Sequence, residues 1–433
     1  MQNLRLIAFF LFSFVSVLAA GSDKSSPLLQ NNSPTQGVAA QLAELGFPSG
    51  QFGYYVGTSV AIGADVIVSG TPYGGSTPAA FVYLKSTKGW NNVQPSAILI
   101  PSDAGNCEYF GRSIAISGDT IVVGDSEDQF GPCGPGAAYV YVKPAGGWSG
   151  KLKETAKLTV VSDSASFDGL GTSVAISANT IVVGAPGEYP YSDPGAAYVF
   201  VEPAGGWIST TETAKLTASD GNLGDGLGTS VSISNQTIVA GAPQHGAGTA
   251  YVFVQPANGW ASMTQTAELT SLPGTPHDGM GTSVAIDGDT LVAGAPYGPV
   301  GANPESAAYV FTKPANGWQN MAEKANLIAP VTQAGFGLAV AIDGNRIAVG
   351  APYFSAPLFR GGYFRGSAFP SEGAVYVFTK KVGGQNAVIV MHGSDARNLS
   401  VLGSSVAISG DVVVGGAPRL GPDRGAVFVF GLQ

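Results

Sequence analysis

Gly171-Thr-Ser-Val-Ala-Ile-Ser177 is followed by the turn Ala178-Asn179 and by the β-branched run Thr180-Ile-Val-Val-Gly184, and this arrangement recurs along the chain. The related seven-residue stretches begin at Gly57, Gly111, Gly171, Gly228, Gly281, Gly337 and Gly403. Successive copies are 54, 60, 57, 53, 56 and 66 residues apart. Self-similarity at such a period is typical of proteins built from stacked supersecondary units, so we expect seven structural repeats.

Each copy carries four short runs rich in Val, Ile, Tyr and Phe. In the third copy, the two runs after residue 184 are Ala196–Phe200 and Ala214–Thr217. Gly, Pro, Asn and Asp separate the runs, which is the pattern of β-strands rather than of helices. Two-residue turns such as Gly118-Asp119 and Gly288-Asp289 favour tight hairpins between the first two runs.

Four antiparallel strands repeated seven times indicate an all-β fold, a seven-bladed β-propeller of four-stranded antiparallel blades. The last copy ends with the run 425–430 and lacks a fourth strand. Residues Ala40–Leu45 are similar to the fourth-strand runs and precede the first copy, as each fourth strand precedes the next copy. We therefore predict that residues 39–46 pair with residues 425–430 and close the ring, which removes an exposed sheet edge.

Composition excludes several function classes. Glycine accounts for 62 of 433 residues and charged residues for only 11%, while hydrophobic residues make up 45%, so the chain is not of the disordered type. Lys and Arg total 20 against 29 Asp and Glu, a net charge of −9. Nucleic-acid binding, which depends on neutralising phosphates with basic residues, is therefore not expected.

The N-terminus predicts secretion. Residues 1–20 combine Arg5, an apolar run from Leu6 to Val17, and small residues before position 21, which is the pattern of a cleaved signal peptide. The apolar run is shorter than the roughly 20 residues that a membrane-spanning helix needs. We interpret residues 21–38 as a disordered spacer and residues 39–433 as the propeller, and we expect no membrane span and a location outside the cell or in the cell envelope.

The units resemble FG-GAP repeats, which build the seven-bladed propeller of integrin alpha subunits. Phe110-Gly111 and Phe336-Gly337 match the FG element. The GAP element is matched by Gly184-Ala-Pro186, Gly241-Ala-Pro243, Gly294-Ala-Pro296, Gly350-Ala-Pro352 and Gly416-Ala-Pro418. The resemblance covers residues 39–433 and implies recognition of an extracellular partner.

One departure from the integrin pattern concerns calcium. In several integrin-like repeats an Asp-rich loop between the first two strands binds the ion, which needs six to eight oxygen ligands. Here that connection is a two-residue turn such as Gly118-Asp119 or Gly344-Asn345. We therefore expect no calcium site of that kind. We also expect no other metal site and no cofactor, because the sequence carries no H-E-x-x-H motif, phosphate loop or dinucleotide fingerprint.

Two features mark the face of the propeller that carries the variable loops. Cys107 and Cys133 lie in two loops of one blade on that face, and a secreted chain permits a disulfide between them. The longest loop, 353–371, is rich in aromatic residues and arginine, the residue types that dominate binding interfaces. Its candidate ligand-binding residues are Phe354, Phe359, Arg360, Tyr363, Phe364 and Arg365. The alternative for these side chains is that they fold over the blade or the channel mouth.

Tryptophan and histidine offer weaker signals. Five copies carry a tryptophan at one turn position, where we expect packing at the blade edge rather than a sugar platform: Trp90, Trp148, Trp207, Trp260 and Trp318. His245 and His277, with Asp278 alongside, form the single acid–base candidate in the sequence. Exposed loop histidines are the simpler interpretation, so we expect no catalytic residues.

We predict a secreted, monomeric, non-catalytic binding or adhesion-like module that recognises an extracellular protein or glycan through the variable loops. Two alternatives remain open. One is a lectin with repeated sugar sites between blades, and the other is a polysaccharide hydrolase or lyase that uses His277 and Asp278.

Overall fold

The computed structural model describes most of the chain from residue 39 onward. The described ranges are 39–46, 55–72, 78–92, 94–103, 109–126, 136–161, 169–187, 193–272, 278–297, 306–323, 325–329, 335–352, 373–379, 387–393, 401–418 and 425–432. The predicted signal peptide and spacer lie outside them. No helix among the described residues is long and apolar enough to cross a membrane.

The described residues form seven antiparallel sheets, which confirms the predicted number of blades. Each blade below is given from its first strand to its fourth. Blade one comprises β2 (Ser59–Ile62), β3 (Val66–Thr71), β4 (Ala79–Leu84) and β5 (Ala97–Leu99). Blade two comprises β6 (Phe110–Ser117), β7 (Thr120–Asp125), β8 (Ala137–Val142) and β10 (Ala156–Thr159). Blade three comprises β11 (Ser173–Ser177), β12 (Thr180–Ala185), β13 (Ala196–Val201) and β15 (Ala214–Thr217). Blade four comprises β16 (Ser230–Ser234), β17 (Thr237–Ala242), β18 (Thr249–Val254) and β20 (Ala267–Thr270).

The remaining blades follow the same plan. Blade five comprises β21 (Ser283–Asp287), β22 (Thr290–Ala295), β23 (Ala307–Thr312) and β25 (Ala325–Ile328). Blade six comprises β26 (Ala339–Asp343), β27 (Arg346–Ala351), β28 (Ala374–Thr379) and β29 (Ala387–Met391). Blade seven comprises β30 (Ser405–Ser409), β31 (Val412–Ala417), β32 (Ala426–Leu432) and the N-terminal strand β1 (Ala39–Leu45).

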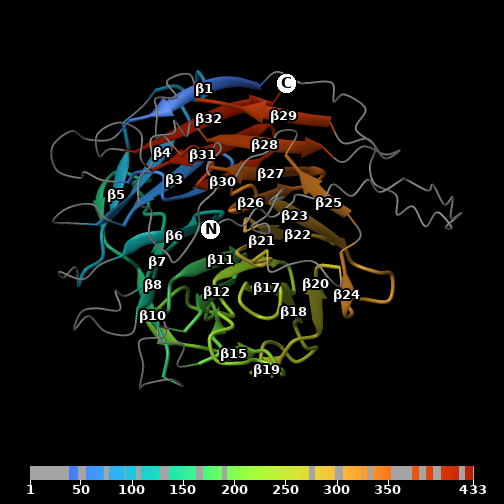
Figure 1. Cartoon of the computed structure of the whole chain (residues 1–433). Helices are drawn as coiled ribbons and strands as arrows, with labels where there is room; N and C mark the ends of the chain where they lie inside the picture. The colour runs from blue at the N-terminus through green and yellow to red at the C-terminus, as the bar shows by residue number, and fades with distance from the viewer. Residues whose placement is uncertain are drawn as a thin grey trace, which may run out of the picture. The chain divides into compact units, whose positions relative to one another are not determined.

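The ring closes as predicted. β1 pairs antiparallel with β32, from Ala39 opposite Leu432 to Leu45 opposite Val427. Figure 1 shows blue β1 lying beside red β32. The first strands of consecutive blades also contact one another all the way round, including β30 with β2. The two ends of the described chain therefore meet within one sheet, and no blade is left with an unpaired fourth position.

Four blades carry a short fifth strand that the sequence did not predict. These strands are β9 (Gly150–Leu152), β14 (Thr210–Thr211), β19 (Met263–Thr264) and β24 (Met321–Ala322). Each runs parallel to the fourth strand of the preceding blade, as β19 does beside β15. Because each precedes the fourth strand of its own blade in the chain, it ties neighbouring blades together at their outer edge.

Glycine pairs let neighbouring blades approach closely. A Cβ atom on Gly241, the first residue of a Gly-Ala-Pro stretch, would lie 1.9 Å from the carbonyl oxygen of Gly281 in the next blade. Gly281 itself has φ = +93°, a conformation that other residues rarely adopt. The same contact joins the other junctions: Gly70 with Gly111, Gly124 with Gly171, Gly184 with Gly228, Gly294 with Gly337, Gly350 with Gly403, and Gly416 with Gly57. The Gly-Ala-Pro glycine and the glycine that opens the next repeat are thus two sides of one contact.

A serine hydrogen bond lies beside most of these glycine pairs. Ser230 Oγ donates to the carbonyl oxygen of Gly281 at 2.8 Å. Equivalent bonds run from Ser59 to Gly111, Ser113 to Gly171, Ser173 to Gly228, Ser283 to Gly337 and Ser405 to Gly57. Blade six carries Ala339 at the serine position, so its junction with blade seven lacks this donor.

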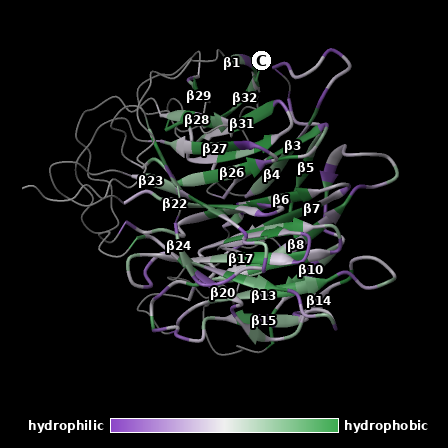
Figure 2. Ribbon diagram, turned by 90° about the vertical axis from the view of Figure 1, so that its right-hand side faces the viewer, coloured by the Kyte–Doolittle hydropathy of each residue, from purple (hydrophilic) through white to green (hydrophobic). Residues whose placement is uncertain are grey.

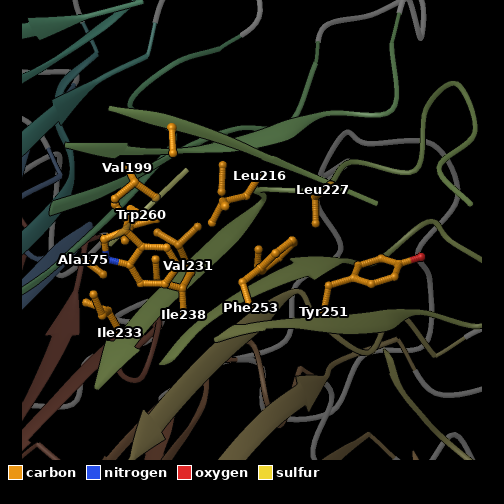
Figure 3. Packing of buried hydrophobic residues seen from close by; sticks show 14 of the residues in the cluster. Ala175, Val199, Leu216, Leu227, Val231, Ile233, Ile238, Tyr251, Phe253 and Trp260 are labelled. Carbon is orange, nitrogen blue, oxygen red and sulfur yellow. The ribbon is translucent and has the colours of Figure 1, made fainter. Parts of the chain in front are cut away.

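Apolar side chains fill the space between neighbouring blades. The strands are largely green in the hydropathy colouring of Figure 2, because both faces of each sheet are covered. Figure 3 shows one such layer, where Val199 and Leu216 of blade three meet Val231 and Ile238 of blade four. The five tryptophans at the repeated turn are all buried, at 2–8% exposure, which confirms packing at the blade edge.

Candidate functional site

Several residues predicted to carry function lie outside the described part of the chain. They are Cys107, Cys133, His277, Phe354, Phe359, Arg360, Tyr363, Phe364 and Arg365. The disulfide and the aromatic loop therefore remain predictions.

Asp278, the other half of the predicted acid–base pair, serves the fold of blade five. Asp278 is buried, with only 2% of its surface exposed. One carboxylate oxygen accepts the Tyr309 hydroxyl hydrogen at 2.5 Å, and the other accepts the Met280 backbone N–H at 3.1 Å. Both oxygens are thus engaged inside the blade. Burial, followed by the Asp278 bond and charge, raises the pKa of Tyr309.

The structure gathers a different set of ionisable groups around His245, at the edge of blade four. His245 lies in the connection between β17 and β18, and Asp220 and Asp225 lie in the connection between β15 and β16. Tyr251 of β18 is paired in register with Glu268 of β20. These connections emerge at the same end of the sheets, which is the face that carries the loops of variable length.

Asp225 fixes the orientation of the His245 ring. His245 Nδ1 lies 2.7 Å from Asp225 Oδ2, and the Asp225 side chain is only 11% exposed. The backbone N–H of Asn222 also donates to Asp225 Oδ2, at 2.6 Å. With Nδ1 facing Asp225, the other ring nitrogen, Nε2, faces the opposite side of the site.

The opposite side of the site holds two carboxylates. His245 Nε2 lies 3.5 Å from Asp220 Oδ2, and Asp220 Oδ1 accepts the Tyr251 hydroxyl hydrogen at 3.0 Å. Figure 3 shows the Tyr251 ring at the edge of the apolar layer with its hydroxyl pointing away from that layer. Ligand atoms of Asp220, His245 and Glu268 all lie within 4.8 Å of one another.

Burial and neighbouring negative charge shift the pKa values of two groups in this site. Burial, and then the negative charge of Asp220, raise the pKa of Glu268, while His245 acts in the opposite direction. Burial also raises the pKa of Tyr251, with the nearby Asp220 as the next cause. The site therefore concentrates negative charge around one imidazole.

In blade two, the equivalent positions carry charges of opposite sign that neutralise each other. There Tyr139 donates its hydroxyl hydrogen to Asp103 at 2.9 Å, as Tyr251 does to Asp220. The position of Glu268 is taken by Lys157, whose Nζ lies 2.5 Å from Asp103 Oδ2 and 5.1 Å from the centre of the Tyr139 ring. Blade four thus replaces the lysine of blade two with a second carboxylate and adds a histidine.

Sequence reasoning found His245 but not its partners. Asp220, Asp225 and Glu268 match no metal or catalytic motif and come from two separate segments, the β15–β16 connection and β20. One signal was present: the fourth-strand runs of blades two and three read Ala-Lys-Leu-Thr, whereas that of blade four reads Ala-Glu-Leu-Thr from Ala267.

Apolar side chains are exposed on the same face of the propeller. Val161, Leu223, Leu272 and Tyr297 lie on connections at this end of neighbouring blades and are 64%, 68%, 53% and 43% exposed. Contiguous exposed apolar surface marks sites of protein contact, whereas single exposed apolar side chains are ordinary on protein surfaces.

Seven four-stranded blades in a closed ring define the described part of the chain as a β-propeller. The FG-GAP repeat model matches residues 94–141, 152–200, 210–253 and 263–311, and the chain is an FG-GAP repeat propeller of the kind found in the N-terminal domain of integrin alpha subunits. Each match runs from the fourth strand of one blade through the third strand of the next, so the sequence repeat is offset from the blade by one strand. A search of curated proteins found no match.

Proposed function

We propose that this protein is a secreted, non-catalytic binding module that recognises an extracellular protein through the loop-bearing face of its propeller. FG-GAP propellers are common binding modules, and the N-terminal 20 residues have the pattern of a signal peptide. The observation that carries the proposal is the exposure of Val161, Leu223, Leu272 and Tyr297 on neighbouring connections of that face.

A protein partner fits these side chains better than a glycan. Leu and Val offer no hydrogen bonds to sugar hydroxyls, but they contribute apolar area to a protein interface. Sugar platforms would use the repeated tryptophans, yet Trp148 and Trp207 are 2% and 4% exposed and pack inside the blade edge. The sequence predicts that Phe364 and Arg365 also contribute to binding, and both lie outside the described residues.

Photocrosslinking tests this proposal with a matched pair of positions. A photoreactive phenylalanine analogue replaces Leu223 in one variant and Ile208 in the other. Ile208 is 57% exposed but lies in the connection between β13 and β15, at the opposite end of the blade. Each purified variant is mixed with extracellular material from the organism that makes the protein and is then irradiated. The products are analysed by mass spectrometry.

We expect a specific protein adduct at position 223 and none at position 208. An adduct of carbohydrate at 223 would favour the lectin alternative. Equal labelling at both positions, or none at 223, would contradict recognition through this face.

A further inference from the structure

The charge balance of blade four differs from that of blade two at equivalent positions. In blade two the Lys157 ammonium neutralises Asp103. In blade four Glu268 stands at the lysine position and faces Asp220, and each carboxylate lies beside the same His245 ring. A cation at the place of the lysine ammonium would restore the balance, and side chains that ligate metals surround that place.

We propose that blade four binds a divalent transition-metal ion, zinc by preference, through His245 Nε2 and one carboxylate oxygen each from Asp220 and Glu268. This site lies at the loop-bearing end of the blade, whereas the two-residue hairpin turns, where integrin-like repeats hold calcium, lie at the other end. It shares the β15–β16 connection with Leu223 of the protein contact proposed above, but different side chains form it.

The histidine is prepared for metal ligation. Metal-binding histidines usually donate their second ring N–H to a carboxylate, which fixes the tautomer and the ring orientation. Asp225 holds Nδ1 in this way at 2.7 Å and is itself fixed by the Asn222 N–H. Tyr251 plays the corresponding part for Asp220 by donating to Oδ1, which leaves Oδ2 turned toward His245.

The distances suit a small ion. Zinc binds imidazole nitrogen and carboxylate oxygen at about 2.0–2.2 Å, so tetrahedral ligand atoms lie about 3.4 Å apart. Nε2 and Asp220 Oδ2 are already 3.5 Å apart. One ligand atom of Glu268 lies within 4.8 Å of a ligand atom of Asp220 and of His245, so a shift of about 1 Å in the Glu268 side chain completes the set.

The donor types favour a transition metal over calcium. Calcium prefers six to eight oxygen ligands, whereas one imidazole with two carboxylates suits zinc or its neighbours in the first transition row. Three protein ligands leave a fourth position for water or for a donor from outside. The Asp220 side chain is 43% exposed, so solvent reaches at least one ligand of the site.

Cobalt substitution tests the site on the intact protein. The metal-free protein is titrated with Co²⁺, whose visible absorption reports coordination geometry, and Zn²⁺ is then added in competition. We expect one equivalent of Co²⁺ to bind with a four- or five-coordinate spectrum, and Zn²⁺ to displace it.

Two variants and one control identify the ligands. Glu268→Lys copies the blade-two arrangement, so we expect it to fold and to lose at least 100-fold in affinity for Zn²⁺. Asp225→Asn removes the orienting carboxylate and should weaken binding 10- to 100-fold without removing a ligand. Asp103→Asn, at the equivalent place in blade two, should leave binding unchanged. Failure of the wild-type protein to bind Co²⁺, or equal affinity in wild type and a folded Glu268→Lys variant, would overturn the proposal.

Discussion

Ser405 Oγ donates a hydrogen bond of 2.8 Å to the carbonyl oxygen of Gly57, although the two residues are 348 positions apart in the chain. The bond joins blade seven to blade one and repeats the contact that Ser230 makes with Gly281 between adjacent blades. The closing junction is therefore built like an internal one, with the same glycine contact between Gly416 and Gly57.

Ser405→Ala should weaken this closure. A typical intramolecular hydrogen bond contributes about 1 kcal/mol, and its loss here also leaves the Gly57 carbonyl without its side-chain donor. We expect the free energy of unfolding, measured by chemical denaturation, to fall by about 1 kcal/mol. Ser409→Ala, at the hairpin end of the same strand, is the control. If both variants lost the same free energy of unfolding, the loss would come from replacing a serine in this strand and not from breaking the bond to Gly57.

Ala339→Ser should have the opposite effect. Blade six lacks the serine that the other blades place against the next repeat, and Gly403 offers the equivalent carbonyl oxygen. The added hydroxyl supplies the missing donor and should raise the free energy of unfolding by about 1 kcal/mol. Ala341→Ser, two residues along the same strand, serves as the comparison. A variant that is no more stable than wild type would mean that the sixth junction does not reproduce the geometry of the others.

Gly241→Ala should prevent the blades from meeting. The new Cβ would lie 1.9 Å from a backbone oxygen of the next blade, which cannot move without displacing β21. We expect a loss of more than about 4 kcal/mol, or no folded protein, as judged by circular dichroism and thermal melting. Gly205→Ala, where a Cβ meets nothing within 4 Å, should melt close to wild type. A folded Gly241→Ala protein with wild-type stability would refute the role of these glycine pairs.

Glu323 should make stability depend on pH in blade five. Burial raises the pKa of this carboxyl above its ordinary value of 4.5, and the charge of Asp278 adds to the shift, against the opposing backbone hydrogen bonds. The folded state thus holds the proton more tightly than the unfolded state. Its contribution is fully present below pH 4.5 and is lost as pH rises toward the raised folded-state pKa.

Glu323→Gln removes this loss of stability at higher pH, because glutamine does not titrate. The difference in free energy of unfolding between variant and wild type should shift in favour of the variant as pH rises above about 4.5. Glutamine is compatible with the position, because Gln265 occupies it in blade four and accepts the Ser219 backbone N–H at 2.9 Å. Denaturation curves at several pH values provide the measurement, and a difference that is constant with pH would contradict the assignment.

The predicted disulfide can be tested without a structure of its loops. Intact mass spectrometry of the purified protein, after alkylation without reductant, should show no alkyl groups on Cys107 and Cys133. Two alkyl groups should be added once the protein is reduced. Two thiols that react in the native, unreduced protein would rule the bond out.

The blade pattern was predictable because it depends on local chemistry repeated seven times. Strands rich in Val and Ile, tight turns such as Ala178-Asn179, and a glycine at each junction are visible in every copy. Closure was predictable because Ala40–Leu45 reads like a fourth strand and the last copy lacks one.

The site around His245 was not predictable in the same way. Asp220 and Glu268 are 48 residues apart. The β18–β20 register places Glu268 opposite Tyr251, and the Tyr251 hydroxyl donates to Asp220, which comes from the connection that enters blade four. The short strands such as β19 were missed because two residues carry no periodicity. Such features follow from how blades are placed against each other, which no single repeat encodes.

The pairing of β1 with β32 also has a consequence for biosynthesis. β1 leaves the ribosome before every other strand of the ring, and β32 leaves after all of them. β1 has no pairing partner until translation has passed residue 432, so the nascent chain carries an unpaired β-strand throughout its synthesis. A cell that makes this protein has to keep that segment from pairing with the wrong neighbour until the last strand arrives.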